Sequence, residues 1–521
     1  MFLLCCVACC TRASSCCSPV FVALSYLRSC IVLAILLSRV TRLFTWPLLL
    51  PVHRSAAEKA AMSTARFSQR IAIIGVGPSG LMAAHSLARA GFKRVSMFDA
   101  APSFAKASPA LQRGGTILAA NGVRILDRMG LLAPIYPRAN PINNVAAFSH
   151  ANHKLSAYSP SALVGAKAKS MLPDSVPITS MAMPGKLLFN TLTKTLPKEV
   201  QVHFGSGLQD IRPKSSSSNN GNGNSQEEAG GPPLELRIGP GGVESFEADL
   251  VLADDGVHSR ARSCMEDFAS HQPKPLEGMY VRGLVSRAIY ESTPTTSTTG
   301  DFSRPPPLRR TDELVEIWGR AGSKFSYAWI DSETIWWMAT LGRKASAGLV
   351  EGAPTLGVQL GNILKAFPEP VGHLVDATAV AAEQPVGPFG FDLCPIEELS
   401  PGARLHSTDG RMALMGSAGH HATQDSFQNL AQQFEDAVVL SSLLTKFDRL
   451  EALKRYSALR VPRAQFVVSA AHSETLQTIE GGRVMSAFRD MASSLIPPAI
   501  QRENQAQILA YDAFKEAEKE I

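Results

Sequence analysis

The chain has 521 residues, of which 45% are hydrophobic and 18% are charged. These proportions are typical of a globular protein with a large core and more than one domain, and they exclude a largely disordered chain. The net charge of +6 is modest and is not concentrated in basic runs with interleaved aromatic residues, which argues against a nucleic acid partner.

Residues 1–61 differ from the rest of the chain. Seven of the nine cysteines lie in the first thirty residues, and only Cys264 and Cys394 lie beyond them. A secreted disulfide scaffold would distribute its cysteines through the fold, so we expect a reduced, cytoplasmic body. The stretch 20–37 is mostly apolar and marginally long enough to cross a bilayer. Three interpretations remain open: an N-terminal membrane anchor, an organelle transit segment, or sequence upstream of a true start at Met62.

Residues 71–100 predict a strand, a helix and a second strand, an order that implies a parallel right-handed crossover. Gly75, Gly77 and Gly80 form a Gly-x-Gly-x-x-Gly motif between the first strand and the helix. In such a motif the glycines permit a tight turn, the close approach of a pyrophosphate, and close packing of the helix on the strand.

Two polar side chains of this unit suit a nucleotide. Ser79 lies in the first turn of the helix, where free N–H groups and the positive end of the helix dipole favour phosphate. Asp99 ends the second strand, nineteen residues past Gly80, where a carboxylate can bind ribose hydroxyls. The unit therefore predicts dinucleotide binding rather than an ordinary glycine-rich turn.

Downstream segments alternate between helix, strand and polar loop patterns. Residues 111–132 predict a loop and a helix, and the low-complexity stretch 214–233 predicts a surface insertion. In the second half, Asp255 and Gly256 follow a predicted strand, and the segment 411–440 leads through two histidines into a helix with an acidic pair.

These three motifs resemble the FAD-dependent aromatic hydroxylases, the single-component flavoprotein monooxygenases of the salicylate and urate hydroxylase type. The resemblance covers about residues 68–475 and implies an α/β fold, in which a Rossmann-like FAD-binding domain carries an inserted mixed β-sheet substrate domain and C-terminal helices. The expected boundaries are 68–140, 245–275 and 405–475 for the FAD-binding domain, 141–244 and 276–404 for the substrate domain, and 476–521 for a C-terminal helical tail.

The resemblance also implies FAD contacts beyond the glycine motif. Arg113 and Gly115 match a block that lies against the flavin or the pyrophosphate, with a solvated surface arginine as the alternative for Arg113. Asp255 and Gly256 match a loop that serves the pyrophosphate and the nicotinamide donor. Ser417 stands where the family has an aspartate that binds the ribityl chain, so the loss of a charge-assisted bond would weaken FAD binding by about 1–2 kcal/mol.

Other positions depart from the family pattern. Asp254 replaces an alanine, and Gln424 replaces a proline. Ser426, Phe427 and Asn429 stand near the flavin ring where the family has glycines, and a phenylalanine crowds an approach that glycine allows. We therefore expect the fold to persist while the flavin end of the site is altered.

On the substrate side, the resemblance of residues 279–339 to the family's substrate sheet suggests two catalytic candidates. Arg282 is expected to act as an electrostatic clamp and Tyr327 as a hydrogen bond donor or acid–base group. The alternatives are a sheet-surface salt bridge for Arg282 and a half-buried core tyrosine for Tyr327. Trp336 and Trp337 must face opposite sides of a strand, so at most one lines the pocket.

The function implied by the resemblance is oxygen transfer. FAD is the expected cofactor, with NAD(P)H and O2 as co-substrates, and a flavin C4a-hydroperoxide hydroxylates or epoxidises a small aromatic or unsaturated substrate. No metal is expected, because the adjacent His420 and His421 point in different directions and lack a partner at ligand spacing. Two alternatives stay open: another flavin oxidoreductase without oxygen insertion, and a degenerate, non-catalytic flavoprotein.

Overall fold

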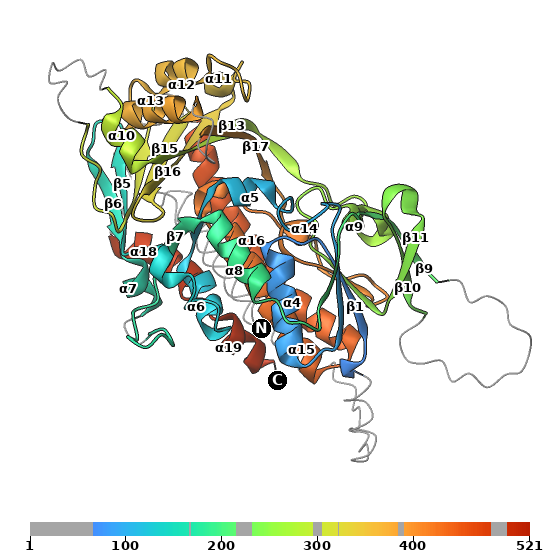
Figure 1. Cartoon of the computed structure of the whole chain (residues 1–521). Coiled ribbons are helices and arrows are strands. Elements are labelled where there is room, and N and C mark those ends of the chain that lie inside the picture. The colour runs from blue at the N-terminus through green and yellow to red at the C-terminus, as the bar shows by residue number, and fades with distance from the viewer. Residues whose placement is uncertain are drawn as a thin grey trace, which may run out of the picture. The chain divides into compact units, whose positions relative to one another are not determined.

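The computed structural model describes residues 66–165, 168–214, 232–294, 305–320, 322–383, 390–480 and 498–520 (Figure 1). The leader 1–61 lies outside these residues, as does most of the insertion 214–233. All described residues belong to one compact unit, Met62–Ile521. Within the described part of the chain, no helix combines the length and the apolar character needed to cross a membrane.

A five-stranded parallel sheet is assembled from segments far apart in the sequence, in the order β18-β12-β1-β2-β8. Its strands are β1 (Arg70–Ile74), β2 (Arg94–Phe98), β8 (Gln201–His203), β12 (Leu250–Ala253) and β18 (Met412–Leu414). Helix α4 (Pro78–Ala90) joins β1 to β2 and is the predicted crossover. All four residues of β12 are buried, as expected for a parallel sheet with both faces covered.

Two long helices follow the last strand of this sheet. Helix α15 (Asn429–Lys446) packs along α4 and buries most of its length, and α16 (Arg449–Ile479) continues from it toward the second half of the molecule (Figure 1). Because α16 contacts both α15 and the strands of the other large sheet, it connects the two halves of the described chain.

An antiparallel meander extends beside the parallel sheet and differs from the predicted domain boundary. It consists of β9 (Leu208–Pro213), β10 (Leu234–Ile238) and β11 (Glu244–Ala248). The sequence predicts residues 141–244 to lie in the substrate domain. The structure instead joins β8 to the parallel sheet and adds Leu208, Leu236 and Ala248 to the core of that sheet, because the inward residues of the meander are apolar.

The second large sheet is mixed and seven-stranded, in the order β17-β13-β16-β15-β14-β5-β6, with β14 and β5 as its parallel pair. Its strands are β5 (Asn144–Ser149), β6 (Lys154–Tyr158), β13 (Lys274–Ser286), β14 (Glu313–Trp318), β15 (Ser323–Trp329), β16 (Thr334–Gly342) and β17 (Gly390–Glu398). Helices α10, α12 and α13 contribute buried residues to the core on one face of this sheet, and α11 packs against that core (Figure 1). They are α10 (Arg287–Ser292), α11 (Arg343–Ser346), α12 (Leu356–Leu364) and α13 (Val371–Ala382).

The opposite face of the seven-stranded sheet meets a small antiparallel sheet, in the order β3-β7-β4, through a shared apolar core. Its strands are β3 (Gly115–Leu118), β4 (Asn140–Ile142) and β7 (Ser180–Pro184). The remaining helices and 3-10 turns before residue 430 are α5 (Pro109–Arg113), α6 (Ala120–Arg128), η1 (Tyr136–Arg138), α7 (Pro160–Val164), α8 (Gly185–Lys194), η2 (Pro240–Gly242), α9 (Arg260–Cys264), η3 (Glu266–Phe268), α14 (Gly416–Gly419) and η4 (Gln424–Ser426).

The C-terminal helices α18 (Pro498–Leu509) and α19 (Ala513–Lys519) pack back on the first half of the chain. Helix α18 contacts α6 and α7, and α19 contacts α15. The guanidinium of Arg128 donates two hydrogen bonds to the carboxylate of Asp512, each at 2.8 Å. The described part of the predicted tail is therefore helical and docked against the predicted FAD-binding domain.

Candidate functional site

A cavity of about 530 Å³ opens at the carboxyl ends of β1, β2 and β12. Gly75 lies here with φ +112°, and a Cβ at this position would come within 2.4 Å of the Asp254 carbonyl oxygen. A Cβ at Gly80 would come within 2.3 Å of the Gly75 carbonyl oxygen. Only glycine therefore fits at these two positions, which allows α4 to begin directly against the sheet.

The start of α4 faces this cavity without a side-chain cap. Gly77 is the N-cap residue, and a Cβ there would meet only the Ser108 hydroxyl, at 3.7 Å. Ser79, in the first turn, is 3% exposed and also lines the cavity. The uncapped helix end and the open space in front of Gly77 suit a phosphate group, whose charge the helix dipole favours.

Asp99 lines the same cavity at the end of β2. Its carboxylate accepts hydrogen bonds from the backbone N–H groups of Val76 at 2.8 Å and Ala101 at 2.7 Å. Each bond occupies one carboxylate oxygen and leaves that oxygen a further lone pair. The contacts thus hold the side chain in place while leaving acceptor capacity for hydroxyl groups of a ligand.

The loop after β12 forms another wall of the cavity. Asp255 accepts hydrogen bonds from the Ser259 hydroxyl and, at 2.9 Å, from the Ala261 N–H group. These bonds fix the loop between β12 and α9, while Gly256 adopts φ +90° with open space where its Cβ would be. Arg262 is fully buried, and its guanidinium donates to the Ala418 carbonyl oxygen at 2.9 Å, which links this loop to α14.

Ser417, in α14, lines the far end of the cavity. Gln433 donates to its hydroxyl at 2.8 Å, and the Nδ1 atom of His421 lies 3.0 Å from the same oxygen. Burial lowers the pKa of the His421 imidazole to about 4, and the neighbouring His420 contributes to this shift. The His421 ring is therefore neutral near pH 7 and can share a hydrogen bond with Ser417.

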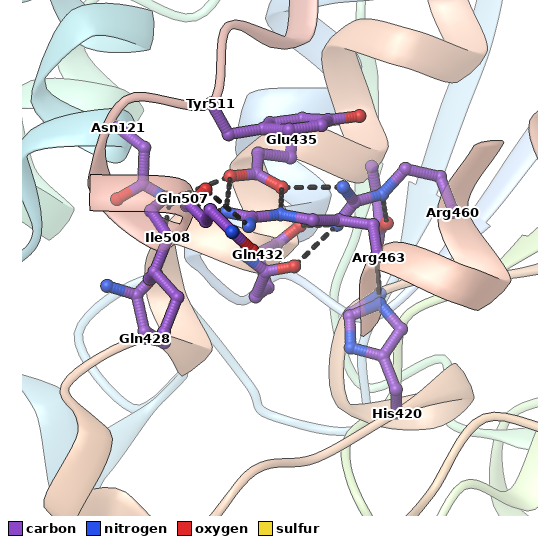
Figure 2. A network of polar contacts seen from close by, with 12 residues as sticks. Asn121, His420, Gln428, Gln432, Glu435, Arg460, Arg463, Gln507, Ile508 and Tyr511 are labelled. Atoms are coloured by element: carbon purple, nitrogen blue, oxygen red, sulfur yellow. Dashed lines mark hydrogen bonds and ion pairs between the residues drawn. The ribbon is translucent and has the colours of Figure 1, made fainter. Parts of the chain in front are cut away.

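A buried ion network contacts the turn at Gly416, and Figure 2 shows its members Glu435, Arg460 and His420. Asp436 accepts hydrogen bonds from the Gly416 N–H group at 2.8 Å, from Arg460 at 2.6 Å and from His420 Nε2 at 2.8 Å. Burial alone would raise the pKa of Asp436, but His420 and Arg460 outweigh it and lower the pKa to about 2. The ionised carboxylate thus fixes the backbone at the start of α14.

The neighbouring Glu435 extends this network to the C-terminal helices (Figure 2). It forms ion pairs with Arg460 at 2.5 Å and Arg463 at 3.1 Å, and it accepts from Asn121 at 2.7 Å. Arg463 also donates to the Ile508 carbonyl oxygen at 2.8 Å. One chain of charged hydrogen bonds therefore runs from the turn beside the cavity to α18.

Two smaller cavities, of about 250 and 170 Å³, lie between the small sheet and the seven-stranded sheet. Arg282 and Trp336 line both. Arg282 donates to Asp392 at 2.8 Å and to Gln424 at 3.3 Å. The structure therefore has the cross-strand salt bridge between β13 and β17 that was the alternative for Arg282. Arg282 also lines both cavities, and its role as an electrostatic clamp stays a prediction. Arg113 is exposed at the end of α5 and lines the larger of these cavities.

The structure does not bring Tyr327 to this site, which corrects its expected role. Tyr327 is 2% exposed and pairs with Trp337 across β15 and β16. Both belong to the core under α12 and α13, on the opposite face of the sheet from Trp336. Alternation along a strand requires this separation, so Trp336 is the tryptophan that lines the cavities and Tyr327 receives no acid–base role.

The loop 424–429 narrows the smallest cavity. Phe427 has φ +52°, in the left-handed region that favours glycine, and its ring lies 5.8 Å from the ring of Trp336. Trp336 in turn packs against Gly115, where a Cβ would come within 2.7 Å of the indole. The sequence predicts that Phe427, in place of a family glycine, crowds the flavin end of the site. In the structure Phe427 forms an aromatic pair with Trp336 beside the 170 Å³ cavity.

A dinucleotide fits the larger cavity at its adenosine and pyrophosphate end. The uncapped helix, the glycine cradle and Asp99 would supply the anion and ribose sites. Ser417 lines this cavity and contacts His421, which lines the 170 Å³ cavity together with Trp336 and Phe427. A bound flavin ring would supply electron transfer from a nicotinamide to oxygen. The residues positioned for that ring are Gly115, Trp336, His421 and Asn429, which line the 170 Å³ cavity.

Comparison with known proteins agrees with this geometry. A family model described as an FAD binding domain matches residues 68–281. The FAD-dependent urate hydroxylase of Klebsiella pneumoniae is 28% identical over 232 residues, which are 44% of this chain and 51% of that protein. The chain thus spans about half the length of that relative. The kynurenine 3-monooxygenase of Salinispora arenicola is 25% identical over 423 residues, which are 79% of this chain and 81% of that protein.

The chain is similar to the FAD-dependent monooxygenases of the aromatic hydroxylase type, and its residues 68–281 match an FAD binding domain. This confirms the predicted family and the predicted cofactor, FAD.

Solved structures support the fold of this protein. Klebsiella pneumoniae HpxO complexed with FAD and uric acid has a TM-score of 0.64 at 20% identity and covers 84% of this chain and 96% of its own. A salicylate hydroxylase substrate complex has a TM-score of 0.63 at 17% identity and covers 87% and 98%. The predicted α/β fold class is thereby confirmed.

Several residues of the site escaped the sequence prediction. Asp392, which fixes Arg282, lies on a strand 110 residues away, and no local pattern pairs the two. Gln433 reaches Ser417 from the second turn of α15. Arg460 and Arg463 face the acidic pair from α16, and their spacing of three residues on one helix is a signal that could have indicated a shared partner.

Proposed function

We propose that this monooxygenase uses NAD(P)H and O2 to hydroxylate or epoxidise a small aromatic or unsaturated substrate on bound FAD. The observation that carries the proposal is the 250 Å³ cavity beside the flavin end, lined by the aromatic rings of Trp336 and Phe391 together with Arg282. Its size suits a single ring system, and its mixed apolar and polar lining is typical of small-molecule sites.

The charges in this cavity favour a substrate with a polar group. Arg113 and Arg282 are cationic, whereas Asp392 and Glu351 are acidic, so the lining is close to neutral overall. Asp392 holds the guanidinium of Arg282 in place. The guanidinium therefore does not have to reorient when charge develops during the reaction. The names of relatives, which include urate hydroxylase, 3-amino-4-hydroxybenzoate 2-monooxygenase and 6-methylsalicylate 1-monooxygenase, agree with this class.

The residues of the chain have three tasks in this reaction. Arg282 and Arg113 orient the polar group of the substrate, while Trp336 and Phe391 hold its ring and exclude water. The neutral His421, hydrogen-bonded to Ser417, can accept or release a proton at Nδ1 near the flavin end. The oxygen chemistry itself is that of the cofactor.

Oxygen incorporation from labelled O2 tests the proposal. The protein is supplied with FAD, NADH or NADPH, and a panel of hydroxybenzoates, aminohydroxybenzoates, urate and kynurenine, and products are analysed by mass spectrometry. We expect one labelled oxygen atom in the product of at least one compound. The Arg282→Met variant should raise KM for the same compound by about tenfold, because one charge-assisted contact is lost.

Other outcomes separate the alternatives. Consumption of NAD(P)H with hydrogen peroxide as the sole oxygen product would indicate another flavin oxidoreductase. Bound FAD that no nicotinamide reduces, with or without the panel, would indicate a non-catalytic flavoprotein. Either result contradicts the proposal.

A further inference from the structure

The carboxyl group of Asp254 is buried in the wall of the 530 Å³ cavity. Asp254 is 8% exposed and lies between the start of α4 and the turn at Gly416. A Cβ on Gly80 would come within 3.1 Å of its Oδ2 atom, and a Cβ on Gly416 within 2.7 Å of its Oδ1 atom. The side chain therefore sits where the pyrophosphate cradle and the α14 turn meet.

Among the residues that the structure describes, this carboxyl group lacks a compensating cation. The neighbours that support its charged form are the Ser79 hydroxyl, which lines the same cavity, and the Gly80 N–H group. Asp254 forms no ion pair within the described part of the chain; the charges that act most strongly on it are the carboxylates of Asp255 and Asp436. A buried carboxylate without a cation beside it is strongly disfavoured.

The neutral form of Asp254 is accordingly favoured in the folded protein. Burial raises the pKa of the Asp254 carboxyl well above its usual value. The Ser79 hydroxyl and the Gly80 N–H group oppose this shift, and the charges of Asp255 and Asp436 add to it. A neutral carboxylic acid has an O–H group to donate, whereas a carboxylate can only accept.

An FAD pyrophosphate would further favour the neutral form of Asp254. Its negative charges belong in front of Gly77 and the first turn of α4, and Asp254 lines the same cavity. An ionised Asp254 would repel them in a desolvated setting, whereas the protonated acid would offer them a hydrogen bond. Binding of the diphosphate and retention of the proton therefore favour each other.

We propose that Asp254 binds FAD as a neutral carboxylic acid, serving as a hydrogen bond donor for the diphosphate, so that FAD binding and protonation of Asp254 are coupled. The proposal rests on the assignment of FAD to this cavity and not on the oxygen chemistry. It makes cofactor loading, and with it the active fraction of the enzyme, sensitive to pH.

Other titratable and charged groups lie near Asp254, and all of them, including His258 and Arg260 on the same cavity, are unchanged in the Asp254 variants of the test below. Asp436 on α15 has a pKa lowered to about 2, and the pKa of Tyr456 on α16 is raised well above 10, first by burial. Asp255 is held by Ser259 and the Ala261 N–H group. His420 and Arg460 face Asp436 from the far side and are common to all variants in the test below.

The test measures the FAD dissociation constant of the full-length protein between about pH 6 and pH 9. For the wild type we expect it to rise toward tenfold per pH unit above the pKa of Asp254 in the FAD-free protein. The Asp254→Asn variant keeps the donor but cannot ionise, so its dissociation constant should stay flat. The Asp254→Ala variant should also be flat, and Asp249→Asn, at the opposite end of β12, should keep the wild-type slope.

Two further ligands separate the diphosphate from the rest of the cofactor. ADP-ribose carries the diphosphate, and its phosphates do not titrate in this range, so it should show the wild-type slope. Adenosine lacks the diphosphate and should bind independently of pH. A flat wild-type curve, or a slope retained in Asp254→Asn, would overturn the proposal while leaving FAD binding intact. Failure of every variant to bind FAD at any pH would instead overturn the assignment of FAD to the cavity.

Discussion

At the scale of single residues, the flavin end of the site is shaped by Phe427. A non-glycine residue with φ near +52° carries a backbone strain of about 1–2 kcal/mol. The ring is tolerated because it packs edge-on against Trp336, at an interplanar angle of 74°. The loss of the family glycine can be predicted from the sequence. The packing partner of Phe427 cannot be predicted in this way, because Trp336 lies on a strand 91 residues earlier and the contact forms only when the sheets pack.

Replacing Phe427 with glycine should open the flavin end. We expect Phe427→Gly to bind FAD several-fold more tightly, because the 170 Å³ cavity gains the volume of a ring. Stability should change little, since relief of about 1–2 kcal/mol of strain offsets the loss of about 1 kcal/mol of aromatic contact. FAD titration and thermal unfolding measure both effects. Phe427→Leu keeps the strain and much of the bulk, so equal affinities of the two variants would contradict the interpretation.

At the scale of elements, charged networks hold the helices to the sheets. Lys324, on β15, is fully buried and pairs with Glu316 at 2.7 Å and with Glu474 of α16 at 2.5 Å. Asp425, in the loop that leads to Phe427, lies 3.8 Å from the same ammonium group. Burial alone would lower the pKa of Lys324, but these acids outweigh it and raise the pKa, so the lysine is charged. It therefore joins the seven-stranded sheet, α16 and the loop at the flavin end.

Removal of the Lys324 charge should destabilise the protein strongly. Lys324→Met leaves three acids without their common cation, and we expect a loss of about 3–5 kcal/mol in the free energy of unfolding. The double variant Lys324→Met/Glu474→Gln should recover part of this loss, because one uncompensated carboxylate is removed. Urea unfolding measures both. Additive losses in the double variant would show that the two groups do not interact.

A second network ties the C-terminal helices to the FAD-binding domain. Arg463→Met removes buried bonds to Glu435 and to α18, so we expect a loss of about 3 kcal/mol in the free energy of unfolding. Arg128→Met is the matched control, because Arg128 is 34% exposed and its pair with Asp512 should contribute below about 1 kcal/mol. Equal stability of the two variants in urea would exclude a structural role of the Glu435 network.

At the scale of the whole molecule, the fold could largely be predicted from the sequence and the site only in part. The glycine motif, Asp99 and Asp255 are local signals, and each lies on the large cavity. The meander β9–β11 could not be assigned to its domain, because its apolar alternation is compatible with packing on either sheet. The role of Tyr327 failed for a related reason: a strand pattern does not reveal which face meets the cofactor.

The acidic pair Glu435 and Asp436 predicts how the stability of the protein changes at low pH. The pKa values of Asp436 and Glu435 are lowered in the folded state, because the effects of His420, Arg460 and Arg463 outweigh that of burial. A lowered pKa contributes stability that is present above the unfolded value, near 4, and is lost as the pH falls toward 2. Unfolding midpoints in urea should thus drop steeply from pH 4 downward. Asp436→Asn should be less stable at pH 7 and show a shallower drop, and a parallel curve would contradict this assignment.

We propose that this chain holds FAD in the cavity formed by the glycine cradle, Asp99 and the Asp255 loop. The most direct measurement is an FAD titration of the purified full-length protein, followed by flavin absorbance and repeated with a Gly77→Val variant. We predict one FAD per wild-type chain with a perturbed flavin spectrum. We expect binding at least tenfold weaker in the variant, because its side chain occupies the phosphate approach, where a Cβ meets only the Ser108 hydroxyl, at 3.7 Å. A wild-type protein that leaves the flavin spectrum unchanged at every FAD concentration would contradict the account.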